Sequence, residues 1–100
     1  MAFKLTLLLC DNMLVSSSSL AAEIFNFAAA MTRARTHTSG DLEIRRISSD
    51  DKPVYTSSGF TVEPTHSLDD VSNNDLIHIP ALWRNPRRAI KKHPQYMPFL

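Results

Sequence analysis

Near its beginning the chain carries a short, nearly continuous apolar run over residues 3–9, which ends at the turn-forming pair Asp11 and Asn12. Such a run, without polar alternation, is typical of a β-strand that is buried on both faces. Strands of this kind belong to parallel sheets whose faces are covered by helices. The run therefore predicts an α/β domain, and 100 residues suffice for one small domain of that class.

An amphipathic helix is predicted next, over about residues 19–31. Four large apolar residues recur at spacings of four, three and four, which places them on one helical face: Leu20, Ile24, Phe27 and Met31. The run of serines before them supplies natural N-caps, and Glu23 near the helix start is favoured by the helix dipole. In a helix of this kind the apolar stripe normally faces the core.

Further apolar runs predict two more strands and a hairpin. Residues 42–47 predict a strand with a more exposed face or edge, because Arg45 and Arg46 interrupt it. Residues 54–62 predict a small hairpin around a turn containing Gly59, and residues 76–79 predict another interior strand. Ser67, three residues before Asp70, predicts one helical turn. This order favours a parallel sheet with right-handed crossovers.

Functional groups in such sheets gather beyond the carboxyl ends of the strands, here residues 10–12 and 81–85. Cys10 lies at such an end and is interpreted as a small buried side chain rather than a reactive thiol. The chain ends with a segment whose Tyr96, Met97 and Leu100 are expected to cover the sheet.

A basic helix is predicted from the N-cap and N1 pair Asn85 and Pro86 to Lys92. The densest charge of the chain gathers here beside Trp83: Arg84, Arg87, Arg88, Lys91, Lys92 and His93. This set could touch phosphates while the indole stacks on a base. Most of the cations share one helical face, so a solvated surface is the favoured interpretation. Trp83 also suits the wall of a pocket for a small organic ligand.

Composition excludes several classes of function. The net charge of +1 creates no global field toward nucleic acid or lipid, and one cysteine allows no internal disulfide. Neither a metal nor a cofactor is expected, because the four histidines lack ligand spacing and two glycines cannot build a phosphate loop. The first apolar run is a poor export signal, and no stretch approaches a membrane helix, so a cytoplasmic protein is expected.

Several words of the sequence together resemble a known family. They are Leu42-Glu43-Ile44, Pro53-Val54 with Thr56-Ser57-Ser58-Gly59, Ser67-Leu68-Asp69-Asp70, and Asp75-Leu76-Ile77-His78-Ile79-Pro80-Ala81-Leu82-Trp83. In this order they resemble the ThiJ/PfpI family of the class I glutamine amidotransferase-like superfamily. Within it, they are most similar to the ligand-sensing domains of AraC-type transcriptional regulators. The resemblance implies a partial flavodoxin-like three-layer fold, with residues 1–100 as the N-terminal half and no helix-turn-helix domain.

The resemblance also implies a ligand pocket and the absence of catalysis. Its candidate residues are Asp11, Glu23, Ala81, Leu82 and Trp83. The family's nucleophile elbow would come after Leu100, so the chain alone is not expected to be an enzyme. Where the family often has a Gly-Gly pair for oxyanion binding, this chain has Ala81 and Leu82, which restrict the backbone. Acyl transfer is therefore doubtful even in a longer relative.

Three functions stay open from the sequence. The preferred one is a truncated sensor module related to AraC-type regulators, which binds a small molecule and contacts DNA only through a separate domain. The second is a fragment of a ThiJ/PfpI-type amidase or protease without its nucleophile, and the third is a nucleic-acid binder using residues 84–93. An incomplete sheet would leave an open edge, so self-association is expected.

Overall fold

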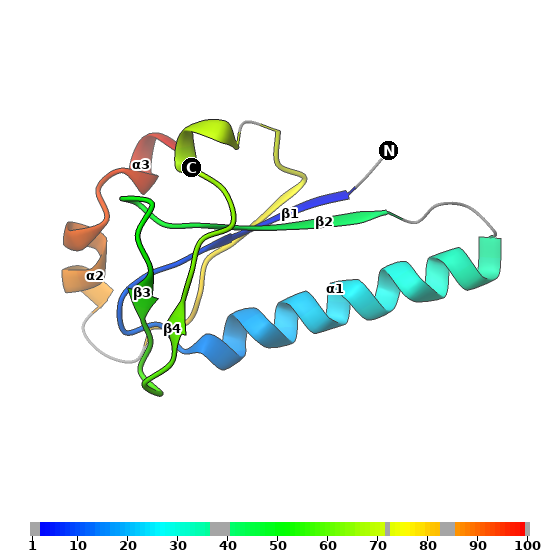
Figure 1. The fold of residues 1–100 in the computed structure, drawn as a ribbon, viewed down its shortest axis with the longest axis horizontal. Coiled ribbons are helices and arrows are strands. Elements are labelled where there is room, and N and C mark those ends of the chain that lie inside the picture. The colour runs from blue at the N-terminus through cyan, green and yellow to red at the C-terminus, as the bar shows by residue number, and fades with distance from the viewer. Residues whose placement is uncertain (1–2, 37–40, 72, 83–85, 100) are drawn as a thin grey trace.

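A computed structural model describes residues 3–36, 41–71, 73–82 and 86–99, and Figure 1 shows their arrangement. The strands are β1 (Phe3–Leu8), β2 (Leu42–Ile47), β3 (Val54–Tyr55), β4 (Thr61–Val62) and β5 (Leu76–His78). The helices are α1 (Val15–Thr36), α2 (Pro86–Lys92) and α3 (Tyr96–Phe99), with a 3₁₀ turn over Leu68–Asp70. The α/β class, the small hairpin and the single helical turn are therefore confirmed. No helix in the described ranges is long and apolar enough to cross a membrane.

The three-stranded sheet has the order β2-β1-β5, and both neighbour pairs are parallel. Leu5 of the central strand lies opposite Ile44 on one side and opposite Leu76 on the other. Strand β1 is buried on both faces, as its apolar run predicts. The prediction that residues 76–79 form an interior strand is wrong for the described sheet, because β5 lies at its edge and Leu76 is 40% exposed.

Helix α1 lies along one face of the sheet (Figure 1), and residue exposure shows which side of the helix faces solvent. The stripe predicted to face the core is exposed, with exposed fractions of 58%, 57%, 68% and 38% for Leu20, Ile24, Phe27 and Met31. Smaller residues such as Ser18 and Ala22 face the sheet instead. Phe25 stacks on Phe3 with ring centroids 5.6 Å apart. The orientation predicted for this helix is thus wrong, and the helix also exceeds its predicted bounds at both ends.

The main hydrophobic core lies at the carboxyl end of the sheet. Leu8, Leu9 and Met13 pack there with residues from several other segments, namely Ile47, Val54, Val71 and Tyr96. Tyr96 donates its hydroxyl hydrogen bond to the carbonyl of Leu9 (2.6 Å) and lies 3.1 Å from that of Ile47. It therefore covers the sheet as predicted, whereas the side chains of Met97 and Leu100 lie outside the part described.

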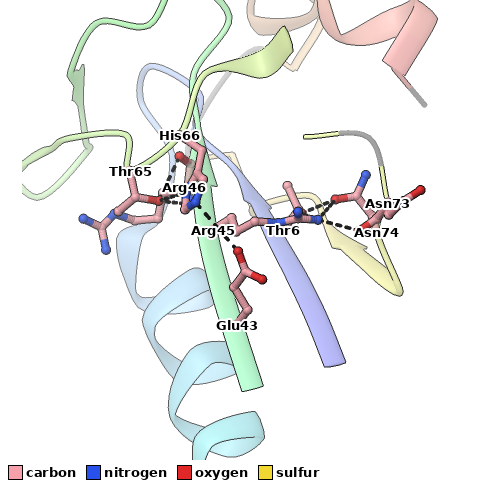
Figure 2. Close-up of polar contacts among 8 residues, drawn as sticks. All are labelled: Thr6, Glu43, Arg45, Arg46, Thr65, His66, Asn73 and Asn74. Carbon is pink, nitrogen blue, oxygen red and sulfur yellow. Dashed lines mark hydrogen bonds and ion pairs between the residues drawn. The ribbon is translucent and has the colours of Figure 1, made fainter. Parts of the chain in front are cut away.

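The two arginines of β2 point to opposite faces of the sheet (Figure 2). Arg45 is buried, with 5% exposed, and its guanidinium donates to the carbonyl of Asn73 (2.8 Å), to Thr6 Oγ1 (3.2 Å) and to Asn74 Oδ1. Arg46 donates through Nε to the carbonyl of Glu63 (2.9 Å). The prediction of a strand with a more exposed face or edge is confirmed in that β2 lies at an edge of the described sheet, but Arg45 is buried because the loop before β5 closes over it.

Candidate functional site

The loop after β1 is held against the loop after β5. Asn12 has φ of 63°, a left-handed conformation that asparagine tolerates, and its N–H donates to the carbonyl of Tyr55 (2.9 Å). Met13 forms an antiparallel bridge with Leu82, and the Leu14 N–H donates to the carbonyl of Ala81 (2.8 Å). The two loops thus meet at one edge, where parallel strands place functional groups.

Asp11 is committed to an ion pair at this edge. Its Oδ2 lies 3.0 Å from Lys92 Nζ, and its Oδ1 accepts a long hydrogen bond of 3.4 Å from the Tyr55 N–H. Burial alone would raise the pKa of Asp11, but the ammonium of Lys92 and the Tyr55 N–H outweigh it and hold the pKa below its usual range. Asp11 therefore stays ionised and joins α2 to the first loop.

His93, which the sequence groups with the surface cations, is buried. Its Nε2 accepts from the Asp11 N–H (3.4 Å), and its Nδ1 lies 2.7 Å from Ser49 Oγ. An accepting Nε2 places the proton of a neutral ring on Nδ1, which then donates to the serine. Burial lowers the pKa of His93, although Asp11 opposes the shift. The ring is therefore a neutral link between the loops after β1 and β2.

Cys10 is also buried at this edge. Burial, with a smaller contribution from the charge of Asp11, raises the pKa of its thiol to about 11. A thiol with so high a pKa carries almost no thiolate at neutral pH, and the thiolate is the nucleophilic form. The structure thus agrees with the interpretation of Cys10 as a packed side chain.

A cavity of about 420 Å³ separates the first turns of α1 from the sheet. Its wall is mainly apolar and includes Leu7, Leu9, Met13, Val15, Ile44 and Val62. Four polar side chains also line it: Ser18, Ser19, Glu23 and Arg46. A concave, mostly apolar space with a few polar groups is the usual form of a small-molecule site.

The residues predicted to share one pocket do not all line this cavity. Glu23 does, whereas Asp11, Ala81 and Leu82 lie at the carboxyl edge outside its lining. The Ala81 N–H is not free for a ligand, because it donates to Ser17 Oγ (3.1 Å), and the Ala81 carbonyl already accepts from the Leu14 N–H. Trp83 and Arg84 fall outside the described residues.

Most of the predicted basic surface lies on α2. Arg87, Arg88 and Lys91 are exposed, while Lys92 pairs with Asp11. No cluster of His, Cys, Asp and Glu suited to a metal ion occurs in the described part of the chain. Sequence reasoning missed Ser18 and Arg46 as cavity residues. Nothing in the serine run distinguishes Ser18 from the neighbouring serines.

Comparison with known proteins shows where this fold occurs. Neither a protein-family model nor a curated protein matches the sequence. A protein from Vibrio parahaemolyticus, described as a transcriptional regulator, matches 93% of this chain with a TM-score of 0.74 and 15% identity. An AraC family transcriptional regulator from Pseudomonas putida matches 93% of this chain with a TM-score of 0.63 and 16% identity. Drosophila melanogaster DJ-1beta matches 81% with a TM-score of 0.61 and 15% identity.

The match covers only part of each of these proteins. It spans 46% of the Vibrio chain, 61% of the Pseudomonas chain and 39% of DJ-1beta. At these identities the likeness establishes the fold. The chain thus shares its fold with about half of each of these proteins, two of which are described as transcriptional regulators and one as DJ-1beta.

Proposed function

We propose that this chain is a ligand-sensing module related to those of AraC-type transcriptional regulators, and that it is not an enzyme by itself. The observation that carries the proposal is the cavity of about 420 Å³ beneath α1. Its volume lies in the range of small-molecule sites. The likeness of 93% of the chain to two proteins described as regulators supports the same function.

The absence of catalysis rests on the chemistry of the carboxyl edge. The sequence holds one cysteine, and burial keeps it in the thiol form. The amide of Ala81, where the family often aims oxyanion donors, is already bonded to Ser17. We expect the chain to release no p-nitrophenol from p-nitrophenyl acetate beyond the rate of its Cys10→Ala variant. A faster reaction of the wild-type chain would contradict this.

The module is also proposed to self-associate in the cytoplasm and to reach DNA only through another domain. Strands β2 and β5 are the two edges of the described sheet, and the outer stripe of α1 is apolar and exposed. Unpaired edges and apolar patches favour association. Sedimentation of the chain over a range of concentrations tests the self-association. A chain that stays monomeric at every concentration and shows a sharp thermal unfolding transition would contradict it.

Binding of a neutral apolar probe tests the sensing function. Indole should shift the amide NMR signals of residues that line the cavity, such as Leu7 and Ile44, more than others. Ala22→Leu places a larger side chain in the cavity wall and should weaken indole binding by about fivefold or more. Ala34→Leu, on an exposed turn of the same helix, is the matched control and should leave binding unchanged. Absence of binding, or equal binding by both variants, would refute the proposal.

A further inference from the structure

Two side chains of opposite charge line the cavity from its two walls. Glu23 comes from α1 and Arg46 from β2, and no ion pair joins them. Glu23 is exposed and makes no ion pair or hydrogen bond within the described residues, so its carboxylate has no described partner. Arg46 is held by the Glu63 carbonyl, and no described carboxylate pairs with it. Both charges thus remain available to a ligand.

Ser18, which also lines the cavity, has a buried hydroxyl without a partner. The residue is only 4% exposed, and its Oγ makes no hydrogen bond within the part of the chain that the structure describes. Its neighbours differ, because Ser17 Oγ donates to the Leu14 carbonyl (2.8 Å) and Ser19 Oγ to the Ser16 carbonyl (3.3 Å). A buried polar group without a partner is costly, and a ligand that hydrogen-bonds to it would remove that cost.

We propose that the cavity binds a zwitterionic α-amino acid with an apolar side chain, an inference that rests on the proposed sensing function. The apolar side chain would lie against Leu7, Leu9 and Ile44. The ammonium group would pair with Glu23, the carboxylate with Arg46, and Ser18 would complete the polar contacts. A simple amine could pair only with Glu23, and a simple acid only with Arg46. In each case the second charged side chain would be left without a partner beside an apolar ligand, which is unfavourable.

Three probes with the same phenyl group separate the charges. L-Phenylalanine carries both, 2-phenylethylamine carries only the ammonium, and 3-phenylpropionate carries only the carboxylate. Titration calorimetry with the full chain should show phenylalanine binding about fivefold or more tightly than either of the other two. If indole binds but either half-probe equals phenylalanine, the ligand class is wrong and the sensing function stands. If indole fails to bind, the sensing function fails, and the ligand class fails with it.

Variants assign each charge to its residue. Glu23→Gln should reduce phenylalanine to the affinity of 3-phenylpropionate, whose own affinity should not fall. Arg46→Gln should reduce phenylalanine to the affinity of 2-phenylethylamine. Asp69→Asn, an exposed carboxylate outside the cavity lining, is the matched control. Because Glu23 is exposed on a long helix, its variant should fold even if Arg46→Gln does not. Unchanged phenylalanine binding by Glu23→Gln would overturn the assignment.

Discussion

The hydroxyl of Tyr96 offers the sharpest test of how the carboxyl edge is stabilised. The residue is 5% exposed, and its hydroxyl contacts the carbonyls of Leu9 and Ile47. Leu9 directly follows β1, and Ile47 is the last residue of the neighbouring strand β2. Tyr96→Phe removes this oxygen and its proton while the ring keeps its volume. The substitution therefore isolates the hydrogen bond from the packing of the ring on His93.

The size of the effect follows from which carbonyl is left without a donor. Ile47 keeps a partner in the variant, because the Leu9 N–H already donates to its carbonyl at 2.9 Å. The Leu9 carbonyl loses the only donor that the described residues give it. One buried acceptor left unsatisfied costs about 1–3 kcal/mol, so we expect a loss of about 2 kcal/mol in the free energy of unfolding. For a domain of this size that corresponds to a melting temperature lower by about 10 °C.

Urea unfolding followed by circular dichroism measures this loss directly. The midpoint should fall while the denaturant slope stays constant, because the surface exposed on unfolding hardly changes. Tyr55→Phe is the matched control, since Tyr55 is 71% exposed and should change stability by less than about 0.5 kcal/mol. Equal stabilities of the two variants would show that the hydroxyl contacts of Tyr96 contribute nothing and would refute the reasoning.

Three further predictions concern the same edge and the basic helix. Because burial lowers the pKa of His93 below 6.5, the unfolded chain takes up its proton first, so stability present at about pH 7.5 should decline toward about pH 5. His93→Gln should flatten that decline, and an unchanged slope in urea titrations would contradict the assignment. The thiol of Cys10 should react with 5,5′-dithiobis(2-nitrobenzoate) far more slowly in the native chain than in urea, so a reaction complete on mixing would count against its burial. The chain should not bind duplex DNA at physiological salt, and salt-sensitive binding that Arg87→Glu with Arg88→Glu abolishes would instead favour the nucleic-acid function.

Much of the fold could be predicted from the sequence because the signals are local. The apolar run at residues 3–9 and the turn pair after it indicate a buried strand. In the structure β1 begins at Phe3 and ends at Leu8, one residue before the end of the run. Strand β2 has the predicted bounds, and α2 ends at Lys92 as its N1 proline and basic last turn indicate. Parallel pairing follows because a helix or other long connection separates these strands, and such connections join parallel neighbours.

The orientation of α1 could not be predicted because the helix is apolar on two sides. Leu20, Ile24 and Phe27 form one stripe, but Ala22, Phe25 and Ala29 recur at spacings of three and four on another. Periodicity identifies residues that share a face, and it does not say which of two apolar faces packs against the sheet. In the structure the stripe of Ala22, Phe25 and Ala29 faces the sheet, and the other stripe remains exposed.

The burial of Arg45 in β2 could not be predicted from the local sequence pattern, because it depends on residues far along the chain. Arg45 lies opposite Thr6 of β1, and the loop at Asn73 and Asn74 supplies the other oxygens that its guanidinium needs. A buried cation that already has acceptors belongs to the fold, although its Nε has none among the described residues. Glu23 differs, because it has no described partner and lies on a cavity. By this reasoning a ligand would bind between α1 and the sheet rather than at the more conspicuous buried arginine.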